Sequence, residues 1–104
     1  MILLGQSNQW EEDLDMAENR NTLEIKYCVA WGYLPQAAWI ATEFFTEFQN
    51  KLEITITPVD DGRLEIYLDG LAIFDRKAEG GHYPGLDKIR ELKKIVRDRL
   101  AVTV

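Results

Sequence analysis

Segments in which apolar and polar residues alternate constrain the fold of this chain more than any other feature of its sequence. An alternation with a period of two is typical of a half-buried β-strand. It occurs at about residues 22–28, 52–58 and 64–68. Because the alternation leaves one face of each strand polar, we expect helices to cover only one face of the resulting sheet.

Two other segments have a helical period. Pro35, a residue favoured in the first helical turn, begins the first of them. Its predicted apolar stripe is Ala37, Ala38, Ala41, Phe45 and Phe48, with Trp39, Ile40 and Phe44 at the margins. The second helix is expected from about residue 86 to 101. Its predicted buried stripe is Ile89, Leu92, Val96 and Leu100.

Asp69-Gly70 is a strong signal for a two-residue hairpin turn, because both central positions of such a turn favour positive φ. The turn predicts that a fourth strand, residues 71–75, pairs antiparallel with the third. The first two strands are joined through a helix and should be parallel. The order β-α-β-β-β-α thus predicts a thioredoxin-like two-layer α/β sandwich, with helices on one face of a four-stranded mixed sheet.

The 104 residues are typical of one domain. We expect residues 1–21 to form a flexible, acidic extension and residues 22–104 to form the domain. The acidic residues of the extension are Glu11, Glu12, Asp13, Asp15 and Glu18. Trp10 either anchors this extension against the domain or lies partly exposed on it.

Composition excludes several classes of function. A net charge of −6 argues against nucleic acid as a partner, since phosphates require clustered Lys and Arg. The sequence has neither an apolar run that could span a bilayer nor the pattern of a signal peptide, so we expect a cytoplasmic protein without membrane contact. A single cysteine fits a reducing compartment. One cysteine and one histidine are too few for a zinc site, and we expect no bound metal or cofactor.

Cys28 lies where the first strand is expected to turn into the first helix. A cysteine at such a position can face the N–H groups and the positive dipole end of the helix, which both favour a thiolate. The alternative is that Cys28 is a small buried apolar residue. Position alone leaves both interpretations open.

Two segments carry a resemblance to a known family. Residues 27–33, Tyr-Cys-Val-Ala-Trp-Gly-Tyr, resemble the region around the Cys-x-x-Cys or Cys-x-x-selenocysteine motif of selenoprotein W-like (Rdx) proteins. Residues 68–77, followed by Gly80-Gly81 and Pro84, resemble the hairpin of that family and its Arg-Lys-x-x-Gly-Gly loop. The similarity runs from about residue 23 to residue 101.

The resemblance implies a thioredoxin-like fold and a role in thiol redox balance coupled to glutathione. Three departures stand out: Trp31 occupies the second redox position, Pro35 enters the helix early, and His82 lengthens the loop by one residue. Without a second thiol, Cys28 cannot release a bound client by itself. Either glutathione resolves the mixed disulfide of a monothiol, or the site is redox-inactive.

The candidate binding residues around Cys28 are Trp31, Tyr33, Arg76, Lys77 and His82. Trp31 either offers a flat platform for glutathione or a peptide, or fills a groove beside the helix. Arg76 and Lys77 either supply positive charge near the thiol and anchor a glutathione carboxylate, or form the charged end of an edge strand. His82 either stabilises the thiolate or is a solvated loop residue.

These observations predict a thiol redox protein in which Cys28 forms mixed disulfides with glutathione or client proteins, a glutathione-linked monothiol oxidoreductase. The alternative is a redox-inactive module that binds a protein partner through its exposed sheet face or through the groove at Trp31. In a third alternative, Cys28 pairs between two chains and gives a redox-controlled dimer.

Overall fold

The computed structural model describes residues 20–102, and the predicted acidic extension with Trp10 lies almost entirely outside them. The elements along the chain are β1 (Asn21–Cys28), α2 (Leu34–Phe48), the single 3₁₀ turn η2 (Gln49–Lys51), β2 (Leu52–Val59), β3 (Leu64–Leu68), β4 (Leu71–Asp75) and α3 (Leu86–Val102). Their order confirms the predicted β-α-β-β-β-α pattern.

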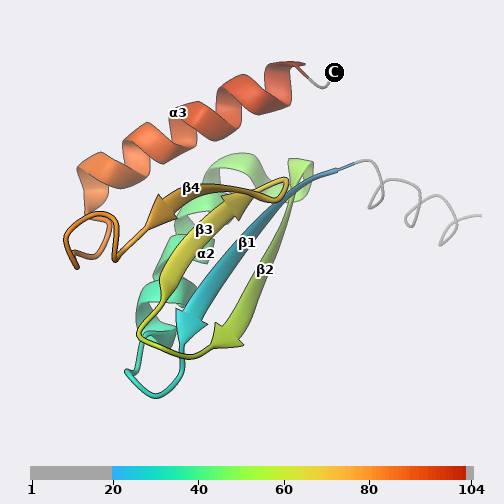
Figure 1. The fold of residues 1–104 in the computed structure, drawn as a ribbon. Helices are drawn as coiled ribbons and strands as arrows, with labels where there is room; N and C mark the ends of the chain where they lie inside the picture. The colour runs from blue at the N-terminus through green and yellow to red at the C-terminus, as the bar shows by residue number, and fades with distance from the viewer. Residues whose placement is uncertain (1–19, 103–104) are drawn as a thin grey trace, which may run out of the picture.

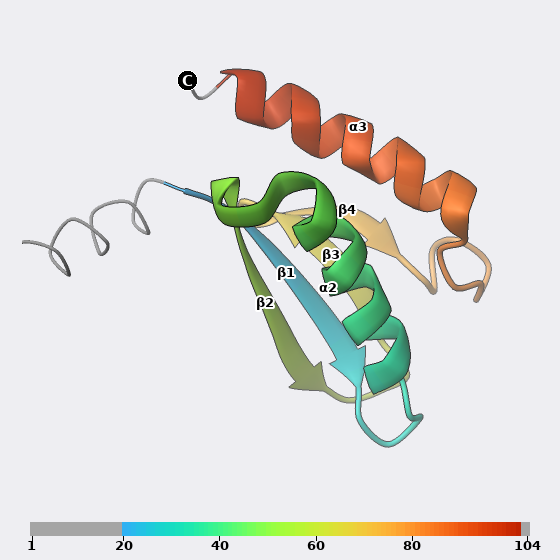
Figure 2. The ribbon, with the colours of Figure 1, turned by 180° about the vertical axis from the view of Figure 1, so that it is seen from behind.

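The four strands form one mixed sheet in the order β2-β1-β3-β4 (Figure 1). β1 is a central strand, parallel to β2 and antiparallel to β3, and β3 pairs antiparallel with β4. Seen from behind, α2 runs across the sheet and α3 lies beside β4 (Figure 2). The fold is therefore the two-layer sandwich that the sequence predicts. β1 carries Cys28 to the end of the molecule where α2 begins.

One apolar core joins the sheet to both helices. Leu23 and Ile25 of β1 and Ile66 of β3 are completely buried in it. From α3, Ile89, Leu92 and Val96 enter the same core and Leu100 packs at its margin, as the helical period predicts. Ion pairs between Lys93 and Glu43 and between Arg97 and Glu47 also link α3 to α2.

The predicted face of α2 is wrong by about one residue. Phe45 is 58% exposed, whereas Phe44 and Ile40, which we expected at the margins, are completely buried. The buried residues of α2 are Ala37, Ile40, Phe44 and Phe48. The helix has adjacent apolar pairs, so its pattern fits two faces about equally well. Which of these two helix faces is buried depends on where the sheet lies.

The Asp69-Gly70 turn confirms the predicted hairpin, with φ of 50° and 85° at its two central residues. The Asp69 carboxylate also accepts hydrogen bonds from the Thr22 N–H at 2.8 Å and the Asn21 side-chain amide at 2.6 Å. A third bond, from Arg99 Nε at 3.0 Å, reaches it from α3. The hairpin thereby fixes the start of β1 and the end of α3 together.

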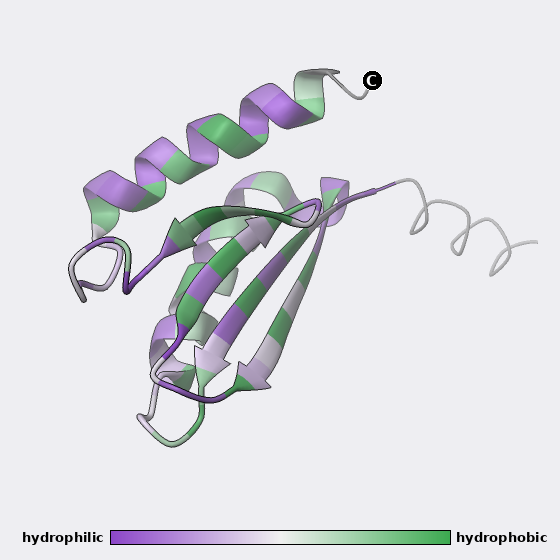
Figure 3. Ribbon diagram, in the orientation of Figure 1, coloured by the Kyte–Doolittle hydropathy of each residue, from purple (hydrophilic) through white to green (hydrophobic). Residues whose placement is uncertain are grey.

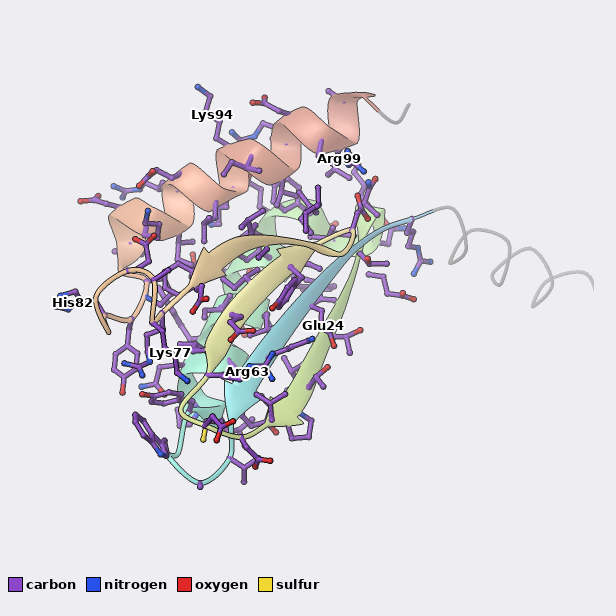
Figure 4. All side chains as sticks on the ribbon, viewed as in Figure 1. Glu24, Arg63, Lys77, His82, Lys94 and Arg99 are labelled. Carbon is purple, nitrogen blue, oxygen red and sulfur yellow. The ribbon has the colours of Figure 1, made fainter. Side chains whose placement is uncertain are left out.

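Hydrophilic and hydrophobic residues alternate along the strands (Figure 3). The sheet face without helices carries a polar network that includes Arg63 (Figure 4). Arg63 donates two hydrogen bonds of 2.9 Å to the Glu65 carboxylate, and the Tyr67 hydroxyl donates a third at 2.7 Å. The Lys26 ammonium lies 4.7 Å from the centre of the Tyr67 ring. These contacts leave Glu65 only 6% exposed, although the alternation placed it on the wet side.

The Arg63–Glu65 pair predicts how stability depends on pH. The hydrogen bonds from Arg63 lower the pKa of Glu65, against the opposing effect of burial. The pair therefore adds stability above the unfolded-state pKa of about 4.3, and this stability is lost as pH falls through the lowered folded-state value. In urea titrations between about pH 6 and pH 3, we expect Glu65→Gln to be less stable at pH 6 and to lose less stability on acidification than the unsubstituted protein.

Glu53→Gln is the matched control, because Glu53 is an exposed carboxylate on the edge strand β2. It should keep the full acid sensitivity. Equal acid sensitivity in the Glu65→Gln variant and the unsubstituted protein would contradict the role of this pair.

Candidate functional site

Cys28 ends β1, and its thiol is buried in this conformation. The residue is 1% exposed and belongs to the hydrophobic core. Its N–H donates to the carbonyl of Arg63 at 2.8 Å, and its carbonyl accepts from the N–H of Tyr33 at 3.2 Å. A reagent can therefore reach the sulfur only after some part of its surroundings moves.

A short turn, residues 29–32, separates Cys28 from the first helix. The Gly32 N–H donates to the Val29 carbonyl at 3.0 Å, and Gly32 adopts a φ of 75° that favours glycine. α2 then begins at Leu34, with Pro35 in its first turn. The first helix thus begins beside Pro35, as the sequence predicts.

Trp31, Tyr33 and Arg76, which we call the aromatic clamp, meet over this turn. The guanidinium carbon of Arg76 lies 5.4 Å from the centre of each aromatic ring. Arg76 also donates to the carbonyl of Gly62 at 3.1 and 3.3 Å, and to the carbonyl of Gly81 at 2.9 Å. The clamp therefore joins three loops that are distant in sequence.

Gly62 lies directly under the exposed ring of Trp31. A Cβ atom at this position would come within 2.8 Å of two carbons of that ring, and its φ of 67° also favours glycine. Trp31 itself remains 60% exposed. The indole thus covers the β2–β3 turn on one side and faces solvent on the other.

Tyr33 connects the clamp to the loop before α3. Its ring meets Trp31 edge to face, with centroids 6.0 Å apart, and meets Tyr83 in the same way at 5.4 Å. Burial raises the pKa of Tyr33, against the opposing effect of Arg76, and the nearby side chains of Tyr83 and Cys28 raise it further. The Tyr33 hydroxyl is therefore neutral at physiological pH and lies close enough to Cys28 to interact with it.

The structure brings some of the candidate residues together and leaves others apart. Trp31, Tyr33 and Arg76 gather next to Cys28 through the contacts above. Lys77 and His82 are exposed on the loop after β4, and His82 points away from the sheet (Figure 4). Within residues 20–102, no hydrogen bond, ion pair or ring contact links either of them to Cys28.

Two features of the site had no clear sequence signal. Gly62 is recognisable from sequence as a turn residue, but its contact with Trp31 depends on the tertiary fold. Beside the clamp lies a hollow of about 260 Å³ between α2 and the loop before α3. It is lined by Pro35, Gln36, Trp39, Ile40, Tyr83 and Pro84.

The described part of the chain contains no group of three or more His, Cys, Asp or Glu side chains placed to hold a metal ion. Over the same residues, no helix has the length and apolar character needed to cross a membrane.

Comparison with known proteins identifies the family. The family model described as the Rdx family matches residues 22–98, well over half of the chain. The chain belongs to the Rdx family. A comparison with curated proteins gave no match.

Two solved structures of similar proteins agree with this assignment. One is a selenoprotein W-related protein from Vibrio cholerae, 32% identical, with a TM-score of 0.68 over 78% of this chain and 98% of that one. The other, from Bordetella parapertussis, is 30% identical, with a TM-score of 0.68 over 77% of this chain and 98% of that one. Membership of the Rdx family confirms the thioredoxin-like fold and implies a thiol redox role.

The contact between Trp31 and Gly62 yields a prediction about access to Cys28. In Gly62→Ala, the new methyl group collides with the indole and should displace Trp31 and the turn that carries it. We expect alkylation of Cys28 in native buffer to become at least about tenfold faster, because the cover of the thiol opens more often. The measurement is the rate of iodoacetamide labelling, followed by mass spectrometry.

Gly70→Ala is the control, since Gly70 has a φ of 85° with no atom within 4 Å of the added Cβ. It should cost a similar backbone strain, about 1–2 kcal/mol, and leave the alkylation rate almost unchanged. Equal acceleration in both variants would mean that labelling follows overall stability and not the position of Trp31.

Proposed function

We propose that this member of the Rdx family acts in thiol redox exchange through Cys28, as a monothiol whose mixed disulfides are resolved by glutathione. The observation that carries the proposal is the position of Cys28. It ends a central strand, at the turn into the first helix, where the resemblance places the first redox cysteine of the family. A reducing compartment such as the cytoplasm would supply glutathione as a co-substrate.

The exchange needs two displacement steps. The Cys28 thiol loses its proton to solvent, and the thiolate attacks one sulfur of a client disulfide. The client S–S bond breaks, and the second client sulfur leaves as a thiolate that takes up a proton. A glutathione thiolate then attacks the client sulfur of the mixed disulfide. This step leaves glutathione on the client and restores the Cys28 thiol after protonation.

Because the thiol is 1% exposed, the first step requires a local opening, and we propose that the adjacent turn at residues 29–32 is the part that opens. The turn has one internal hydrogen bond and one to β2, from the Val29 N–H to the Val59 carbonyl at 3.2 Å. Trp31 lies against Gly62, Tyr33 and Arg76 and is 60% exposed. A cation–π contact at an exposed site contributes only about 0.5–1 kcal/mol. Local opening without global unfolding therefore has a modest free-energy cost.

The alternative function is a redox-inactive module that binds a protein partner. The observation that favours it is that Cys28 belongs to the buried core, as a structural cysteine does. The two functions make opposite demands on the thiol. Exchange requires Cys28, whereas a binding module should bind its partner equally well after Cys28→Ser.

Incubation of the folded protein with oxidised glutathione tests the proposal. We expect mass spectrometry to detect one glutathione per chain on the unsubstituted protein, none on Cys28→Ser, and full removal of the adduct by reduced glutathione. If the adduct forms only in denaturant, the redox-inactive module is the better description. A disulfide-linked dimer would appear instead as a doubled mass that reductant removes.

A further inference from the structure

The hollow beside the aromatic clamp is uncharged and lies one ring away from the reactive cysteine. None of its six lining residues carries a charge. Tyr83, which lines the hollow, contacts the ring of Tyr33, and the N–H of Tyr33 binds the carbonyl of Cys28. Tyr33 therefore links Cys28 to the hollow, and a segment bonded to the Cys28 sulfur can extend towards it.

The size of the hollow suits one large apolar side chain. An apolar cavity of about 150 Å³ can hold a benzene molecule. The 260 Å³ available here, between the rings of Trp39 and Tyr83, leaves room for a phenyl ring or a branched aliphatic side chain. Burying such a group removes apolar surface from water and so favours binding.

Gln36 adds a polar feature that matches a peptide. Its side-chain oxygen is buried and has no hydrogen-bond partner within the described chain. An unsatisfied buried acceptor destabilises the protein, and a donor that arrives with a ligand recovers the lost free energy. The backbone N–H of an extended segment is such a donor. Apolar side chains and backbone N–H groups occur together in a protein segment.

The charges around Cys28 match glutathione poorly. Glutathione has two carboxylates, and their recognition calls for free cationic side chains. Arg76 already donates to two backbone carbonyls and lies against two rings, and Lys77 and His82 have no contact with Cys28. The exposed large apolar side chains at this end are Val29, Trp31, Leu34, Tyr83 and Leu86. The exposed charges of the neighbouring β2–β3 turn, Asp60 and Asp61, are negative and would repel carboxylates.

We propose that the hollow binds a large apolar side chain of an extended client segment, and that the substrates of Cys28 are protein disulfides flanked by such a residue. The client's backbone N–H donates to Gln36, and its apolar residue lies within about four positions, or ~13 Å, of its cysteine. Cys28 bonds to that cysteine's sulfur, and the other sulfur of the client disulfide leaves as a thiol. This substrate class rests on the thiol exchange proposed above, with glutathione acting only as the resolving thiol.

The test compares disulfide-containing peptides. Each peptide has one cysteine joined to 2-mercaptoethanol by a disulfide. In one series Phe lies two, three or four positions after this cysteine. In the matched series Ala replaces Phe. We expect the best Phe peptide to form its mixed disulfide with Cys28 about tenfold faster than the Ala peptide, a free-energy difference of about 1.4 kcal/mol. Oxidised glutathione should react no faster than the Ala peptide.

Trp39→Ala removes one wall of the hollow at a position that is 37% exposed, so the fold should tolerate it. It should reduce the preference for Phe to less than about threefold, because the rate with the Phe peptide falls towards the rate with the Ala peptide. Phe45→Ala is the matched control, because Phe45 is an exposed aromatic residue of the same helix outside the hollow. It should keep the full preference.

Binding without chemistry separates this proposal from the proposed function. The Cys28→Ser protein is titrated with a Phe peptide in which serine replaces the cysteine, and the protein's NMR signals are followed. If Cys28 reacts with no probe but this titration shifts the signals of Trp39 and Tyr83, the docking site stands and thiol exchange is wrong. If Cys28 reacts equally fast with Phe and Ala peptides, or if Trp39→Ala keeps the preference, the docking site is wrong and exchange stands. If Cys28 reacts with no probe and the titration shifts no signals, both the docking site and the thiol exchange are wrong.

Discussion

The contact of one guanidinium with two aromatic rings organises the functional end of this protein. Arg76, at the end of β4, lies against Trp31 and Tyr33 and donates to the carbonyls of Gly62 and Gly81. It therefore joins the β1–α2 turn, the β2–β3 turn and the loop after β4. These segments are distant in sequence, and the order of the strands brings them to the same end of the sheet. The positions of Cys28, its covering turn and the neighbouring hollow all depend on this junction.

Trp31 stands where the family resemblance would place a second redox residue, and this has two physical consequences. It removes the thiol that could resolve a mixed disulfide, so a thiol from solution must complete any cycle. It also supplies the indole that lies over Gly62 and against Arg76. One side chain thus changes both the chemistry available to Cys28 and the access to it. This is why we propose a covered monothiol and not an incomplete dithiol.

Local rules explain most of the fold that could be predicted from sequence. The alternation of the strands, the Asp69-Gly70 turn and the stripe of α3 each depend on neighbours along the chain, and each agrees with the structure. The face of α2 could not be predicted, because Phe44 and Phe45 satisfy the helical period equally well. The burial of Glu65 also escaped prediction, since it depends on Arg63 and Tyr67 lying on either side of one carboxylate. The position of Cys28 in the sequence was informative, but its burial, the contact of Trp31 with Gly62 and the hollow at Trp39 arise only when separate loops meet.

The most direct test of the account is the urea dependence of Cys28 labelling under native conditions. An opening of the turn at residues 29–32 exposes little surface, so its dependence on urea should be far below the about 1–3 kcal/mol per molar of complete unfolding. The account predicts labelling by a thiol reagent that is faster than global unfolding and almost independent of urea at low concentrations. A labelling rate that follows global unfolding at every urea concentration would contradict it, and Cys28 would then be a structural residue of the core.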